Sequence, residues 1–309
     1  MTYLVTGGTG FVGSYLAKEL ANRGENVVVF DQVIRHQPNS EFYDDMEVVQ
    51  GDVSSLEDVL DAVRKFDITR IVHLAYLLMP ESESNIARAM RVNVDGFRNI
   101  FEAARLADVE RIVWPSSVSA YGLSTNHVGT ITEDAPLKPI LFYGACKVFN
   151  EEVARHYHRL YGLDYMALRY GSVYGPGRQR GFSAFMVDLI EKPAVGEPVK
   201  IELGDESLNW VYIKDAVRAT VLACTVKETK NRVFNIVGEA KSVREVADYI
   251  RKLLPHSKIE LLLGKIGRQV QFDGTRAHLE LGYKPEYSVE RGVREHINIV
   301  RKQRDLPPV

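Results

Sequence analysis

The 309-residue chain lacks the features that mark secreted and membrane-spanning proteins. It has only two cysteines, Cys146 and Cys224, and both fall in segments that we predict to be helical. Two buried, reduced thiols are the simplest interpretation, and they fit a reducing cytoplasm. The longest apolar run, 71–79, is too short to span a bilayer. Met1 leads directly into a predicted strand, so we expect no signal peptide.

The chain also has no large excess of positive or negative charge. The net charge is −2, from 39 basic and 41 acidic residues that are interspersed along the chain. Because no basic stripe or acidic tail is present, we expect no nucleic-acid partner and no membrane surface. No spacing of His, Cys, Asp and Glu resembles a metal site, and no internal repeat is visible. A compact enzyme with a small-molecule substrate is the default interpretation for this length.

Strands and helices alternate along the first half of the chain. Predicted strands occupy 3–6, 26–31, 47–50, 69–74, 111–116 and 164–169, and predicted helices occupy 13–22, 56–65, 84–106 and 143–161. The strands are nearly all apolar, which is typical of a parallel sheet covered by helices on both faces. We therefore predict an α/β fold with a doubly wound parallel Rossmann sheet.

A smaller C-terminal α/β lobe is predicted where proline and glycine cluster, between 175 and 204. Ser242 and Glu245 form a predicted capping box, and Ser288 is predicted to begin the last helix. The segments 210–213, 215–225 and 233–237 suggest a return to the first domain. We assign 1–173 and about 209–238 to a cofactor-binding domain, and about 174–208 and 239–309 to a substrate-binding lobe.

A glycine-rich turn lies between the first predicted strand and helix, in the run VTGGTGFVG. Gly7 permits the sharp turn, Gly10 lets the backbone approach a phosphate, and Gly13 lets the helix pack on the strand. The helix N-terminus adds partial positive charge. The spacing favours a dinucleotide pyrophosphate site, although small residues also make tight turns in α/β proteins without a cofactor.

Two carboxylates end neighbouring predicted strands. Asp31 stands where an acidic group meets the ribose hydroxyls of adenosine, and it would repel a 2′-phosphate. It therefore favours NAD over NADP, a preference that Arg35 could soften. Asp52, in the run GDV at 51–53, could face the adenine amino group; an N-cap of the following helix is an equally good interpretation.

Tyr143 and Lys147 stand four residues apart, so on a helix they share one face. A nearby ammonium stabilises phenolate, which lets a tyrosine act as a general base. Ser117 follows an apolar strand at the edge where ligands bind, and it could orient a reacting hydroxyl toward Tyr143. The alternatives are an ordinary surface pair on a helix and a loop serine that caps a turn. Ser116 is predicted to be structural.

Taken together, the chain resembles an extended short-chain dehydrogenase/reductase of the NAD-dependent epimerase/dehydratase family. The matching runs, in chain order, are TGGTGFVG, Asp31, GDV, HLA at 73–75, VNVDG at 92–96, PSSVSAYG at 115–122, YGACK and VYGPG at 173–177. The resemblance implies that Ser117, Tyr143 and Lys147 are catalytic. It implies NAD as the cofactor, with Lys147 on the nicotinamide ribose. Further cofactor contacts are expected from Phe11, Val12, Val53, Leu74, Ala75 and Asn93.

The chain departs from the family pattern at substrate positions. Ser172 stands where nucleotide-sugar enzymes typically have asparagine, and Asn209 replaces an arginine that often contacts the diphosphate. An amide does not reproduce a bidentate guanidinium. Replacement charge could come from arginines of the second lobe, namely Arg178, Arg180, Arg268 or Arg276. Val118 and Ser119 stand where sugar 4,6-dehydratases have Asp-Glu, so we do not expect dehydration.

The function expected from this resemblance is a nucleotide-sugar 4-epimerase that works through a transient keto intermediate. One alternative is an NAD-dependent dehydrogenase of a non-nucleotide sugar or other hydroxy compound, and a remote one is a non-catalytic NAD(H)-sensing protein. His73 is expected to be packed, and His127 could touch substrate. The resemblance also implies a homodimer through the helices near 84–106 and 143–161, with Val148, Val153 and Ala154 either at that interface or in the protomer's own core.

Overall fold

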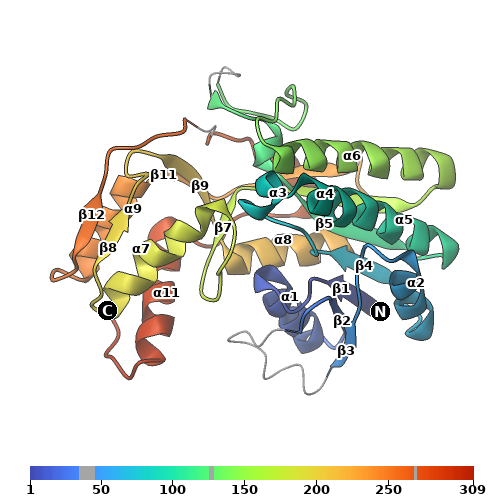
Figure 1. The fold of residues 1–309 in the computed structure, drawn as a ribbon, viewed down its shortest axis with the longest axis horizontal. Helices are drawn as coiled ribbons and strands as arrows, with labels where there is room; N and C mark the ends of the chain where they lie inside the picture. Colours follow the sequence, from blue (N-terminus) through green and yellow to red (C-terminus); the bar gives the residue numbers. More distant parts are fainter. Residues whose placement is uncertain (35–45, 125–128, 268–269) are drawn as a thin grey trace.

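The computed structural model describes residues 1–34, 46–124, 129–267 and 270–309. Its centre is a seven-stranded sheet in which every strand is parallel to its neighbours (Figure 1). The spatial order of the strands is β10 (Val233–Ile236), β6 (Asp164–Tyr170), β5 (Arg111–Ser117), β4 (Arg70–His73), β1 (Thr2–Thr6), β2 (Asn26–Asp31) and β3 (Glu47–Gln50). The predicted doubly wound parallel sheet is confirmed.

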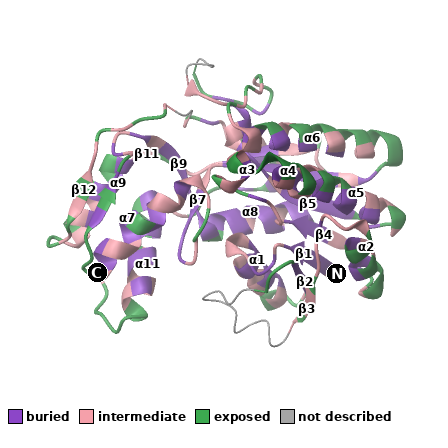
Figure 2. Cartoon of the chain, in the orientation of Figure 1, coloured by how far each residue is buried: buried purple, intermediate pink, exposed green. Residues whose placement is uncertain are grey.

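Helices cover both faces of this sheet because its strands are apolar on both sides (Figure 2). In β1, Tyr3 and Val5 pack under α1 (Phe11–Asn22) and α8 (Ile213–Thr225). The intervening Leu4 faces the opposite core, which is closed by α2 (Leu56–Lys65), α5 (Gly96–Leu106) and α6 (Phe142–Tyr161). This two-residue alternation places a buried apolar layer on each side.

The predicted helix over 84–106 is confirmed from Ile86 to Leu106, but it is not a regular α-helix throughout. The structure has α3 (Glu81–Ser84), α4 (Ile86–Ala89), a π-helical segment (Met90–Asp95) and then α5. The Asn93 side chain accepts from the Leu77 backbone N–H at 2.7 Å and donates to the Leu77 carbonyl at 3.0 Å. Asn150 of α6 donates to the Asn93 carbonyl at 2.7 Å. These contacts turn Asn93 inward and draw its carbonyl out of a regular α-helical pattern.

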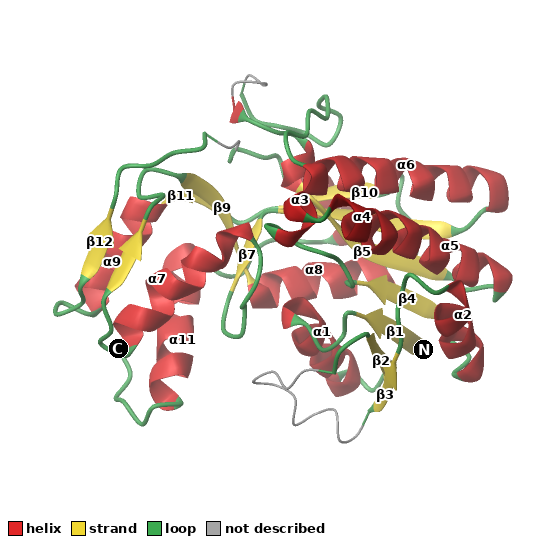
Figure 3. Ribbon diagram, viewed as in Figure 1, coloured by secondary structure: helices red, strands yellow, loops and turns green. Residues whose placement is uncertain are grey.

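The remaining strands form two small sheets away from the main one (Figure 3). One contains β11 (Glu239–Ser242), β9 (Ser207–Tyr212) and β7 (Ser172–Tyr174), and the other contains β12 (Ile259–Leu261) and β8 (Val199–Ile201). Around them and beside the main sheet lie α7 (Phe185–Ala194), α9 (Val243–Leu253), α10 (Thr275–Leu281) and α11 (Val289–Lys302). The strand β9 thus joins the three-stranded sheet, whereas α8 and β10 return to the main sheet. The domain boundaries stay a prediction.

Local signals begin the helices of this part of the chain. Ser242 and Glu245 make the predicted capping box at the start of α9. The Ser288 hydroxyl accepts from the Arg291 backbone N–H and begins α11, as predicted. No helix among the described residues is both long and apolar enough to cross a membrane.

Phe97 lies fully buried at the centre of the core under α5. Its ring lies 4.6 Å from the Trp114 ring and 4.7 Å from the Phe101 ring. We expect Phe97→Ala to lower the free energy of unfolding by about 3–5 kcal/mol, because it leaves a cavity. The measurement is urea unfolding. The control is Leu279→Ala, a side chain 75% exposed, which should change stability by about 0.5 kcal/mol or less. A loss of similar size in both variants would contradict this account of the core.

Candidate active site

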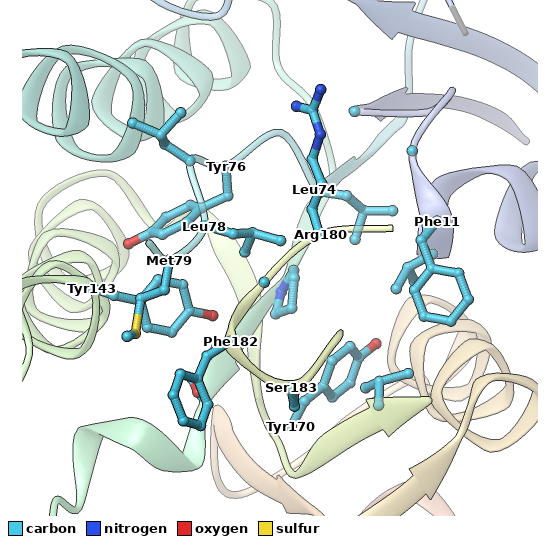
Figure 4. Close-up of a pocket in the computed structure, with 18 of the residues that line it drawn as sticks. Phe11, Leu74, Tyr76, Leu78, Met79, Tyr143, Tyr170, Arg180, Phe182 and Ser183 are labelled. Carbon is cyan, nitrogen blue, oxygen red and sulfur yellow. The ribbon is translucent and has the colours of Figure 1, made fainter. Parts of the chain in front are cut away.

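A cleft of about 400 Å³ lies at the carboxyl ends of the central strands (Figure 4). In open α/β sheets this edge is where ligands bind. Most of the predicted site residues line it, namely Gly7, Gly10, Phe11, Val12, Gly13, Asp31, Asp52, Val53, Leu74, Ala75, Ser117, Tyr143, Lys147, Ser172, Arg178 and Asn209. Segments far apart in the sequence therefore meet in one cavity.

Two predicted residues do not line the cleft. Asn93 is fully buried. Its side chain makes hydrogen bonds to the backbone of Leu77, and Leu77 lines the cleft. Arg276 forms an ion pair with Asp134 at 2.5 Å and a longer one with Glu133 at 3.5 Å. Arg35, His127 and Arg268 lie outside the described residues.

His73 is packed, as expected. Its Nδ1 atom lies 2.7 Å from the Thr6 hydroxyl. Burial, with a smaller effect of the Lys147 charge, lowers the pKa of His73 to about 3. The imidazole is therefore neutral at physiological pH and serves the core.

The glycine turn leaves no room for side chains. A Cβ atom on Gly13 would lie 2.3 Å from the Gly7 carbonyl oxygen, and one on Gly7 would lie 2.7 Å from the Ala75 nitrogen. Gly7 also has a φ of +65°, which favours glycine. No side chain caps the start of α1 after Gly10, and Phe11 lines the cleft beside it. The positive end of this helix therefore faces the cleft, as an anion site requires.

The Asp31 carboxylate is fixed at the edge of the cleft. Thr9 donates to its Oδ2 atom from the hydroxyl at 2.7 Å and from the backbone at 3.2 Å, and Val33 N–H donates to Oδ1 at 3.3 Å. Asp52 accepts from Gln32 at 2.8 Å and also lines the cleft. The N-cap of α2 is Ser55, so the alternative interpretation of Asp52 as the N-cap is wrong.

Ser117, Tyr143 and Lys147 come together from β5 and α6. The Ser117 side chain is close enough to the Tyr143 phenol to lower its pKa, and the Ser117 hydroxyl accepts from the Ser119 backbone N–H at 3.1 Å. Burial raises the pKa of Tyr143, while the Ser117 hydrogen bond and the Arg178 charge lower it. The phenol therefore depends on nearby positive charge and hydrogen bonding to ionise.

Lys147 lies under aromatic rings with its ammonium buried. Its Nζ atom donates to the Pro115 carbonyl at 2.6 Å and lies 3.3 Å from the centroid of the Tyr76 ring and 5.5 Å from that of Tyr143. Burial lowers the pKa of Lys147 to about 7, against the opposing effects of Cys146 and Glu151. The lysine is thus poised to change charge near neutral pH.

A buried ion pair supports the helix that carries these groups. Glu151, one turn after Lys147, accepts from Arg169 of β6 at 2.6 and 2.9 Å. The Ser116 hydroxyl donates to the same carboxylate at 2.6 Å. Ser116 therefore has the structural position predicted for it, and it links β5 to α6.

Two further polar side chains of the cleft, Arg178 and Asn209, bond to neighbouring loops. Arg178 donates to the Ser183 hydroxyl at 2.9 Å and to the Val173 carbonyl, and burial lowers its pKa to about 10. The Asn209 side chain accepts from Gly238 N–H at 2.9 Å and donates weakly to the Gly238 and Val270 carbonyls. Asn209 thus stabilises a turn between strands as well as lining the cleft.

A family model, NAD dependent epimerase/dehydratase family, matches residues 3–237. The chain belongs to this family. The predicted resemblance is therefore confirmed.

Three proteins show how far the likeness of this family member extends. A putative UDP-glucose 4-epimerase of Methanocaldococcus jannaschii is 29% identical over 96% of this chain and 97% of its own length. The crystal structure of a UDP-glucuronic acid 4-epimerase from Bacillus cereus, in complex with UDP-glucuronic acid and NAD, is 26% identical with a TM-score of 0.82 and covers 98% of this chain and 100% of its own. A GalE-like L-threonine dehydrogenase from Cupriavidus necator, in its holo form, is 26% identical with a TM-score of 0.87 and covers 96% and 99%.

Sequence reasoning on this epimerase/dehydratase family member missed several cleft residues. Tyr76, Leu78, Met79 and Phe182 gather with Tyr143 at one end of the cleft, opposite Phe11 (Figure 4). The Tyr76 ring meets the Tyr143 ring edge-on at 5.5 Å, and among the described residues its buried hydroxyl has no hydrogen-bond partner. In the sequence, only the position of Tyr76 directly after the HLA run could have indicated its place in the cleft. An aromatic residue after a strand is, however, usually part of the core.

The lowered pKa of Lys147 predicts a pH dependence of stability. Between pH 7 and 10 the unfolded chain keeps a proton on this lysine that the folded chain has released, so raising the pH favours the folded state. The quantity to follow is the difference in unfolding free energy between the wild type and Lys147→Met, both without cofactor. This difference should increase with pH, by at most about 1.4 kcal/mol per pH unit. Urea unfolding at pH 7, 8 and 9 measures it. A difference that stays flat or falls would contradict the buried ammonium.

Proposed function

We propose that this protein is an NAD-dependent nucleotide-sugar 4-epimerase. The observation that carries the proposal is the meeting of Ser117, Tyr143 and Lys147 in the cleft that the glycine turn also lines. Family membership and full-length similarity to a putative UDP-glucose 4-epimerase support it. So does the similarity to a UDP-glucuronic acid 4-epimerase whose structure contains NAD.

The residues of the cleft fit NAD. The turn at Gly7, Gly10 and Gly13 offers backbone and a helix N-terminus to a pyrophosphate, and a Cβ atom would fill it. Asp31 would accept hydrogen bonds from ribose hydroxyls and repel a 2′-phosphate. When bound, NAD supplies the hydride acceptor for the carbon that bears the reacting hydroxyl.

The protein's own groups handle the proton. Tyr143 removes the proton of the sugar 4-hydroxyl, and Ser117 holds that hydroxyl toward it. Lys147 stabilises the phenolate by its charge and, by family resemblance, holds the nicotinamide ribose. Because burial opposes ionisation of the Tyr143 phenol, the reaction needs the lysine in its charged form. Tyr143 returns the proton when the configuration at that carbon has been inverted.

Inversion requires the transient keto sugar to present its opposite face. Leu78, Met79 and Phe182 form the wall near Tyr143, and their side chains offer almost no directional hydrogen bonds. A wall of this kind lets a ketone turn without breaking strong contacts. Arg178, which donates to the Val173 carbonyl and the Ser183 hydroxyl, is the cation that we assign to an anionic group of the substrate, because no carboxylate forms an ion pair with it in the part of the chain that the structure describes.

Purified protein should interconvert a nucleotide sugar and its 4-epimer without net redox change. A panel of UDP-, dTDP- and GDP-sugars and free acidic sugars, with product stereochemistry and NADH absorbance followed together, tests this. Tyr143→Phe should lower kcat by about 10²–10⁴-fold, because the proton acceptor is lost. Tyr161→Phe, at an exposed position of the same helix, is the matched control.

Two outcomes would reject the assignment. Stoichiometric accumulation of NADH with released keto product would indicate a dehydrogenase, as in the L-threonine dehydrogenase neighbour. Unchanged turnover in the Tyr143→Phe protein would show that the triad is not the catalytic group.

We also propose a cytoplasmic homodimer. The two cysteines are free and buried, which fits a reducing compartment. Of the residues first considered for the interface, Ala154 lies in the protomer's own core and Val153 packs against that core. Phe149 and Leu160 of α6 are instead 53% and 61% exposed, and a partner would cover them.

The dimer is tested by the mass in solution. Light scattering should give twice the chain mass of 34.9 kDa, and Phe149→Glu should shift the protein toward the monomer because it places a charge in the apolar contact. A wild-type protein that is monomeric at micromolar concentration would reject the dimer.

A further inference from the structure

The catalytic tyrosine lies in the first turn of its helix. The helix α6 begins at Phe142, and Tyr143 is its second residue. Leu141, at the N-cap position, has no side chain that can accept a hydrogen bond. The first backbone N–H groups of a helix have no partner within it, so a start of this kind needs an acceptor from elsewhere.

Glu83 supplies that acceptor from a distant part of the chain. Its Oε2 atom accepts from the Phe142 backbone N–H at 2.9 Å, and its Oε1 atom accepts from the Tyr143 backbone N–H at 2.9 Å. The Ser82 hydroxyl donates to Oε1 at 3.3 Å. A carboxylate that receives two helical N–H groups makes charge-assisted bonds, and it also complements the positive end of the helix dipole.

The same short segment forms a wall of the cleft. Figure 1 shows α3, which contains Glu83, against the first turn of α6, and these two helices are in contact. The chain that leads into α3 contributes the lining residues 74–79, and α3 itself contributes Glu81. The clamp of Asn93 on Leu77 fixes that chain at one point, and the Glu83 carboxylate fixes it at another. The cleft wall and the catalytic helix are therefore joined through one side chain.

We propose that Glu83 is a positioning residue for the reaction: it holds the backbone of Tyr143 so that the phenol stays aligned with Ser117. The inference rests on the proposed function, because it takes Tyr143 as the base. Glu83 does not line the cleft, so it acts only through the first turn of α6. A misplacement of about 1 Å in a catalytic group can cost about a hundredfold in rate.

Three substitutions at Glu83 give a graded test. Glu83→Ala removes both acceptors, and Glu83→Gln keeps one and turns an NH₂ group toward the other N–H. Glu83→Asp keeps the charge on a shorter side chain and should restore part of the activity. We expect Glu83→Ala to lower kcat by about ten- to a hundredfold, with Glu83→Gln and Glu83→Asp in between. The KM values for NAD and the sugar substrate should stay within about threefold, because binding groups are untouched.

The matched control is Glu152→Gln. Glu152 is an exposed carboxylate on the same helix, and it pairs with Arg155 three residues later. Its kcat should remain within about twofold of wild type, as is usual for an exposed pair. Glu83→Ala should also change the residual rate of the Tyr143→Phe protein by less than about twofold, because both substitutions act on the same group.

Amide hydrogen exchange gives a readout that does not depend on activity. Peptides that contain residues 142 and 143 should exchange at least about tenfold faster in Glu83→Ala, since these two N–H groups lose their acceptor. Unchanged exchange there, a kcat within twofold of wild type, or the same fold loss with Tyr143→Phe would overturn the proposal. An inactive wild type with the expected exchange pattern would instead count against the proposed function alone.

Discussion

The buried pair between Glu151 and Arg169 sets the geometry on which the rest of the site depends. Both side chains are at most 8% exposed, and the guanidinium meets the carboxylate with two hydrogen bonds. Breaking such a pair leaves an uncompensated charge in the interior, which costs several kcal/mol. The helix α6 therefore cannot slide or rotate on the sheet. Lys147 and Tyr143 lie one and two turns before Glu151, so their positions follow from this contact.

The same carboxylate also aligns the strand that carries Ser117. Ser116 donates to Glu151, and the next residue in β5 is Ser117. The strand β5 and the helix α6 are thus held together one residue away from Ser117. At the N-terminus of α6, the contact of Glu83 with the backbone of Tyr143 adds a second fixed point. A side chain that is held at both ends of its helix segment needs little reorganisation when a ligand binds.

Burial works against the charged forms of both Tyr143 and Lys147. It raises the pKa of the Tyr143 phenol and lowers that of the Lys147 ammonium, so each charged form alone is penalised. The Ser117 side chain and the Arg178 charge act in the opposite direction on the pKa of Tyr143. Lys147 rests on the Pro115 carbonyl and the face of Tyr76, with its ammonium 5.5 Å from the centroid of the Tyr143 ring. Tyr76 is therefore part of the electrostatic environment of the pair as well as of the wall of the cleft.

The sequence by itself determined the elements whose geometry is local. The glycine turn, the carboxylate at the end of β2, the pairing of Tyr143 with Lys147 and the capping box of α9 are set by neighbours within a few residues, so spacing was enough to predict them. Only the tertiary structure decided the π-helical segment within the helix over 86–106, where the Asn93 side chain bonds to the backbone of Leu77 sixteen residues earlier. The same holds for Tyr76 on Lys147, for Arg276 outside the cleft, and for Glu83 at the start of α6, 60 residues before Tyr143. Contacts between distant segments depend on how the layers pack, and no periodicity along the chain encodes which side chain will meet which.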